Sequence, residues 1–193
     1  MVQVGNEKQD SYGDINHKLD YRIGNREHGQ LVQIDRANEA LAVTITGALP
    51  TYSAAFSFAA VSGDAVVIFG SVLHNIRVQE IVIAKPSAIE TVLIVQRSTL
   101  DTGGTSTLAV NGLVDPDDPI TSTAVRLYTA APTLGTSAGT IARAVVNISD
   151  LMVFSFKDWP KPPTLRNSTD CLAVNVDASA TLPGWIVWTE EAR

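Results

Sequence analysis

Two short motifs in this chain carry residue types that hydrolases use. Asp101-Thr102-Gly103 reproduces the triplet whose aspartate shares a proton across the dyad of aspartic proteases, and Gly135-Thr136-Ser137-Ala138-Gly139 matches the G-x-S-x-G nucleophile elbow. Neither motif has the surroundings it needs, because Ser98-Thr99-Leu100 precedes Asp101 and no histidine follows Ser137. We predict a loop in which Asp101 accepts backbone N–H groups, a tight hairpin turn at 135–139, and no catalytic residues or enzymatic activity.

A cluster of aspartates offers a second kind of chemistry. Asp115, Asp117 and Asp118 could give three carboxylates to a calcium ion, which prefers oxygen ligands. The EF-hand pattern fails, because its sixth position is Ile120 instead of glycine and its twelfth is Arg126 instead of glutamate. The sequence favours a solvated acidic turn, and these aspartates remain weak metal candidates.

Histidine and cysteine usage argues against a zinc site. His17, His28 and His74 are far apart in the sequence, and Cys171 is the only cysteine. The apolar neighbours of Cys171 indicate a small core residue. We therefore predict no metal and no cofactor.

Three tryptophans could form a platform that stacks on sugar rings. Trp185 and Trp188 lie three residues apart in an expected strand, so one should face the core and the other solvent or a partner. Glycan contact through Trp159 or Trp188 remains an alternative. Candidates for contact with a partner are Tyr12, Tyr21, Thr102, Trp159 and Trp188.

Composition narrows the classes of partner. The 193 residues are 45% hydrophobic and only 18% charged, so much of the surface is small and weakly polar. The net charge is −6 and the 14 Lys and Arg are scattered, which disfavours direct nucleic-acid binding. No apolar run approaches the ~18 residues of a membrane span, and no leader pattern is present. We therefore expect a protein that does not bind membranes and that stays in the cytoplasm until it assembles.

Short β-rich runs separated by turn signals dominate the chain. Residues 1–29 are polar and charged and indicate an N-terminal arm or linker, whereas 30–193 indicate one all-β domain without helices, an antiparallel sandwich or a barrel. The expected strands are 31–35, 41–46, 52–61, 65–71, 76–84, 89–96, 124–129, 140–147, 151–156, 171–176 and 185–189.

Three segments resemble a family of small structural proteins of tailed-bacteriophage virions. They are Val95 to Ser106, with its Arg-Ser-Thr-x-x-Thr-Gly-Gly-Thr-Ser loop, Ala124 to Gly135, with Tyr-Thr-Ala-x-Pro-Thr, and Trp185 to Glu191, with Trp-Thr-Glu-Glu. The similarity covers roughly the C-terminal half of the chain. The segment from Trp159 to Pro163 and the N-terminal arm depart from the pattern, and no functional residues carry over.

The resemblance implies a non-enzymatic virion component that is in the host cytoplasm before assembly. We expect an antiparallel β-sandwich, a jelly roll, that forms a homo-oligomer, with a trimer as one arrangement. Its partners would be copies of itself and the major capsid or tail proteins, at the head or at a tail or collar position. Residues 1 to about 30 would anchor it, while 102–119 and 159–166 make lateral or outward contacts. The alternative is a tail-associated receptor- or glycan-binding module.

Overall fold

The computed structural model describes residues 32–35, 40–43 and 49–193. The chain divides into two units, Met1–Gly47 and Ala48–Arg193. In the first unit, β1 (Val32–Asp35) pairs antiparallel with β2 (Ala40–Val43) in a sheet of their own. The predicted arm, with Tyr12 and Tyr21, lies outside the described residues.

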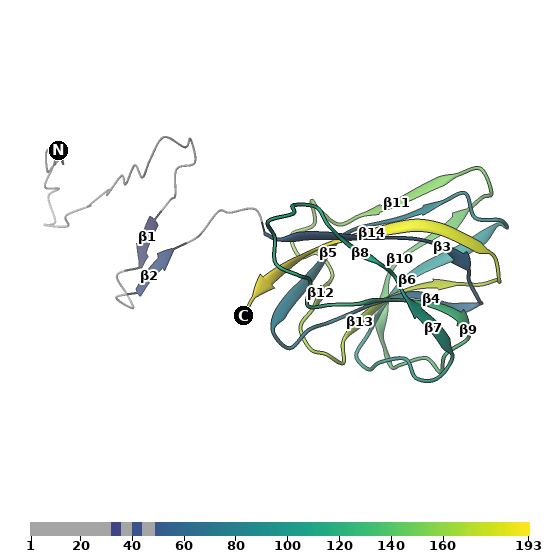
Figure 1. The fold of residues 1–193 in the computed structure, drawn as a ribbon, viewed down its shortest axis with the longest axis horizontal. Coiled ribbons are helices and arrows are strands. Elements are labelled where there is room, and N and C mark those ends of the chain that lie inside the picture. Colours follow the sequence, from purple (N-terminus) through teal and green to yellow (C-terminus); the bar gives the residue numbers. More distant parts are fainter. Residues whose placement is uncertain (1–31, 36–39, 44–48) are drawn as a thin grey trace, which may run out of the picture. The chain divides into compact units, whose positions relative to one another are not determined.

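Two antiparallel sheets pack against each other in the second unit, the arrangement of a β-sandwich, and the larger of two buried apolar clusters draws on both sheets (Figure 1). The first sheet has the order β10 (Ser137–Val146), β6 (Glu90–Arg97), β13 (Cys171–Val176), β4 (Gly63–Phe69), β9 (Val125–Ala130), β7 (Thr105–Leu108). The second has the order β11 (Leu151–Ser155), β5 (His74–Ala84), β14 (Thr181–Ala192), β3 (Thr51–Ala59), β8 (Asn111–Leu113), with β12 (Thr164–Leu165) also beside β5.

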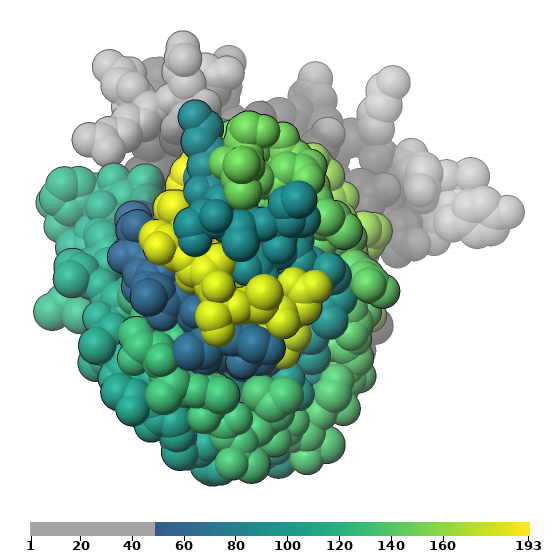
Figure 2. Space-filling view, turned by 90° about the vertical axis from the view of Figure 1, so that its right-hand side faces the viewer, coloured from purple at the N-terminus to yellow at the C-terminus, as the bar shows by residue number. Residues whose placement is uncertain are grey.

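Alternation along the strands builds the core between the sheets. In β14, Leu182, Ile186 and Trp188 are buried while Trp185 is exposed, as expected when successive side chains point to opposite faces. Trp188 stacks on Tyr52 of the neighbouring β3, with the ring centroids 5.9 Å apart. Figure 2 looks onto one end of this unit, where the yellow segment of β14 lies against the blue segment of β3.

Early strands of the sandwich pair with late ones. β3 pairs with β14, β4 with β13, β5 with β11, and β6 with β10. Residues 98–136 join β6 to β10 and add strands to both sheets. In the first sheet, β9 pairs with β4 and β7 pairs with β9. In the second sheet, β8 pairs with β3. We call residues 98–136 the excursion.

The all-β prediction is confirmed for residues 49–193, which contain no helix and therefore no helix that could span a membrane. Each of the eleven expected strands overlaps a strand of the structure. The tight turn predicted at 135–139 is wrong, because Ser137 already pairs with Arg97 at the start of β10. A β-bulge at Ser137–Gly139 accommodates Gly139, whose φ is +151°.

Candidate functional site

A buried ion pair lies where the excursion leaves the first sheet. The Arg97 guanidinium donates to both carboxylate oxygens of Asp64, with Nη2 2.8 Å from Oδ1, and both side chains are almost fully buried. The Asn175 side-chain amide donates to the same Oδ1 at 2.7 Å. Such a two-pronged, doubly supported pair compensates for removing both charges from water.

A β-bulge brings the two charges together. Ala65 is the extra residue between Asp64 and Val66 where β4 faces β13. A bulge breaks the alternation of a strand and redirects the side chain next to it. Asp64 thereby reaches Arg97 at the end of β6, while Val66 keeps its place in the apolar core.

Asp101, near the start of the excursion, contacts both Arg97 and Gly135 at its end. Its Oδ1 accepts the Gly135 N–H at 2.7 Å and lies 3.6 Å from Arg97 Nε, while Arg97 Nη1 donates to the Gly135 carbonyl at 2.8 Å. The prediction that Asp101 accepts a backbone amide is confirmed. Burial, reinforced by the neighbouring Asp64 and opposed by the Gly135 hydrogen bond, raises the pKa of Asp101 to about 6.

The remaining residues with catalytic side chains are placed elsewhere. Ser137 is exposed on β10, and His74 Nδ1 lies 3.8 Å from a Glu190 oxygen. Cys171 is buried, as predicted for a core residue, and burial raises the pKa of its thiol to about 12. The structure therefore pairs Asp101 with Arg97 and His74 with Glu190.

Glu190 is a second buried anchor for the excursion. Its carboxylate accepts hydrogen bonds from the Ser122 hydroxyl at 2.6 Å and from the Trp188 indole N–H at 3.2 Å. The Ser122 backbone N–H and the Thr121 hydroxyl also donate to it. Burial pulls the pKa of Glu190 upward, but these hydrogen bonds hold it below its usual value. We did not predict this role. The alternation of β14 places Glu190 on the same buried face as Trp188, which is the signal that would have shown it.

The three aspartates of the predicted acidic turn differ in their hydrogen bonds. Asp115 accepts the Asp117 N–H at 3.0 Å, and Asp118 accepts the Thr51 N–H at 3.1 Å, which fixes the turn to the start of β3. Asp115 and Asp117 are exposed. Among residues 49–193 no three acidic, histidine or cysteine side chains are grouped as metal ligands.

A groove of about 530 Å³ lies beside β5, where the chain leaves that strand and returns to it. Phe156 N–H donates to the Gln79 carbonyl, and Val78 N–H donates to the Pro163 carbonyl, so residues 157–162 loop out between these two bonds. Pro160, Pro162 and Pro163 limit the backbone freedom of this loop.

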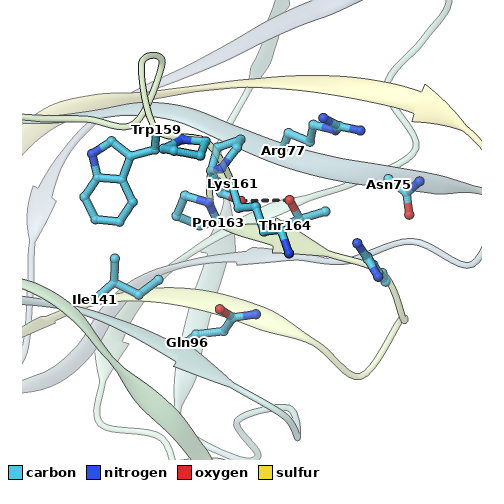
Figure 3. Close-up of a pocket in the computed structure, with 11 residues that line it drawn as sticks. Asn75, Arg77, Gln96, Ile141, Trp159, Lys161, Pro163 and Thr164 are labelled. Carbon is cyan, nitrogen blue, oxygen red and sulfur yellow. Dashed lines mark hydrogen bonds between the residues drawn. The ribbon is translucent and has the colours of Figure 1, made fainter.

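Aromatic, amide and cationic side chains line the groove. Figure 3 shows Trp159 at one end and Asn75 at the other, with Lys161 and Thr164 between them. The lining residues are Asn75, Arg77, Gln96, Ile141, Trp159, Pro160, Lys161, Pro162, Pro163, Thr164 and Arg166.

The candidates for partner contact differ in accessibility. Trp159 is 45% exposed and packs edge-on against Phe156, with the centroids 5.1 Å apart. Thr102 is exposed in the excursion, where it pairs with Thr133. Trp188 is fully buried, so an interface role does not fit it, and Trp185 is the tryptophan of β14 that solvent reaches.

No protein-family model, curated protein or solved structure matches this chain.

Large apolar side chains are exposed at both edges of the sandwich. On the side of β7 and β8 they are Leu108, Val110, Leu113, Val114 and Ile120. On the side of β10 and β11 they are Val145, Ile148, Leu151 and Val153. Exposed apolar groups on sheet edges are typical of surfaces that a partner covers.

Proposed function

We propose that this protein is a non-enzymatic structural component of a bacteriophage virion that stabilises or decorates the head, or a tail or collar position, as a homo-oligomer. The observation that carries the proposal is the exposed apolar side chains at the two opposite edges of the sandwich. Edges of this kind can be covered by neighbouring subunits, and repetition multiplies modest contacts into stable occupancy. The buried ion pair and the Glu190 network keep the excursion, which carries one of these edges, in a fixed shape.

We further propose that the sandwich is a jelly roll. The supporting pattern is the succession of pairs β3–β14, β4–β13, β5–β11 and β6–β10, which fall alternately in the second and first sheets. A long antiparallel hairpin rolled up on itself produces this succession. The excursion is then an extra segment in the connection at the far end of that hairpin.

The copy number in purified virions tests the virion assignment. We expect quantitative mass spectrometry to find this chain in fixed stoichiometry with the major capsid protein after loosely bound material has been stripped. Many copies per particle would assign it to the head shell, and a few would assign it to a vertex, collar or tail. Its absence from stripped virions would overturn the proposal.

The N-terminal arm is proposed as the anchor. Deletion of residues 1–28 should lower the occupancy of the protein on particles prepared without it, because contacts made by these residues would add to those of the sandwich. Reconstitution of such particles with full-length and shortened protein measures this occupancy. Equal occupancy would show that the sandwich alone attaches.

The second candidate function is a receptor- or glycan-binding module, favoured by the half-exposed Trp159 at the groove. A tryptophan face beside amide side chains is suited to stack on a sugar ring. On a glycan array, binding lost in Trp159→Ala and kept in Trp185→Ala would support this candidate. Trp185 is a matched control because it is an exposed tryptophan outside the groove.

A further inference from the structure

The groove and the acidic turn lie on opposite sides of the second sheet, at the same level along its strands. Thr164 of β12 faces Arg77 of β5, Arg77 faces Thr189 of β14, and Thr189 faces Thr51 of β3. The Thr51 N–H in turn bonds Asp118 of the acidic turn. One row across the sheet therefore begins at the groove and ends at the turn.

The turn presents negative charge between apolar side chains. Val114 and Ile120 are 61% and 88% exposed and flank the exposed Asp115 and Asp117. Hydrogen bonds to Thr51 and Tyr52 hold the turn on the body of the sandwich, with the Tyr52 hydroxyl donating to the Pro119 carbonyl at 2.8 Å. We call residues 114–120 the acidic knob.

The groove presents the complementary chemistry. Its apolar part is formed by Trp159, Ile141 and the prolines, and its cations are Arg77, Lys161 and Arg166. Glu191 pairs with Arg77, and Asp170 accepts the backbone N–H of Arg166. Within residues 49–193 no carboxylate forms an ion pair with Lys161 or Arg166, so these two side chains supply the groove's excess positive charge.

We propose that the acidic knob of one copy docks in the groove of a second copy, so that the subunits associate head to tail. This inference rests on the proposed homo-oligomer and names the surfaces that form it. Charge and apolar character match on the two sides, and a second copy carries the required knob. A head-to-tail contact closes into a ring when it adds rotation without translation, and a knob and a groove at the same level of the sheet are compatible with such a contact.

Charge exchange tests the contact with the full-length chain. Asp117→Lys and Lys161→Glu should each weaken self-association about tenfold in sedimentation velocity, because each turns an attraction into a repulsion. The double variant, in which both charges are exchanged, should associate again like the wild type. Raised salt should weaken the wild-type association, since these charges lie at the surface.

Lys85→Glu is the matched control, because it makes the same charge change in the exposed residue that follows β5, at the end of that strand away from the groove, and should leave the knob–groove contact unchanged. Circular dichroism and thermal unfolding confirm that each variant folds. A wild type that stays monomeric, single variants that associate normally, or a double variant that stays dissociated would each overturn the proposal. Groove variants that lose binding to an acidic oligosaccharide while association is unchanged would assign the groove to a glycan instead. Virion copy number is measured separately, so a failure here is distinct from a failure of the virion assignment.

Discussion

Arg97 shows how single residues keep the excursion in place. It bonds Asp64 within the sheet and the Gly135 carbonyl where the excursion ends, while Asp101 lies 3.6 Å away where the excursion begins. Two carboxylates thus share one cation in a buried site, and one Asp101 oxygen, Oδ2, has no hydrogen-bond partner there. Burial of the second negative charge therefore works against the folded state at neutral pH.

This arrangement predicts a pH dependence of stability. The pKa of Asp101 is raised to about 6 in the folded chain, above the value of about 4 of an unfolded aspartate, so the folded state binds the proton more tightly. The wild type should gain about 1–2 kcal/mol of unfolding free energy as pH falls from 7.5 to 5.

Asp101→Asn removes this titration and retains an oxygen that can accept the Gly135 N–H. At pH 7.5 the unfolding free energy of Asp101→Asn should exceed that of the wild type, because the variant lacks the buried charge. Urea unfolding of both proteins across this pH range measures this difference, which should shrink as the pH falls. Parallel pH profiles for the two proteins would contradict the role assigned to Asp101.

At the scale of the elements, β14 is the central strand of the second sheet and tolerates little added volume. A Cβ at Gly184 would lie 2.2 Å from the Val82 carbonyl oxygen and 2.9 Å from the Phe56 ring. Gly184→Ala should therefore lower the unfolding free energy by about 1–3 kcal/mol. Gly112→Ala on the edge strand β8 meets nothing closer than 3.4 Å and should be nearly neutral by the same denaturant titration.

Strand positions could be predicted from the sequence because apolar alternation and turn residues mark them. Three strands lacked that signal: β7 is Thr-Ser-Thr-Leu and mostly exposed, β8 spans three residues, and β12 spans two. Their pairing depends on tertiary contacts, as does the bulge that turned the expected hairpin at Gly135–Gly139 into the start of β10. The groove was equally out of reach, because it joins β5, β6, β10 and the loop at 157–162, which meet only in the fold.

At the scale of the whole molecule, the sandwich carries its own core. The buried apolar cluster extends from Tyr52 to Trp188 and draws on both sheets. A chain that begins at Ala48 should unfold within about 2 °C of the full-length protein in calorimetry, because it keeps every residue of that cluster. A much lower melting temperature would show that residues 1–47 stabilise the sandwich.

The pairing of β3 with β14 also has a consequence for synthesis. β3 is synthesised long before β14, the central strand with which it pairs. β5, which pairs with the other edge of β14, is also synthesised before it. Contacts this distant in sequence slow folding and leave strand edges open meanwhile. A chain that terminates before Thr181 lacks the strand that joins β3 to β5. The second sheet is therefore completed only after β14 has been synthesised.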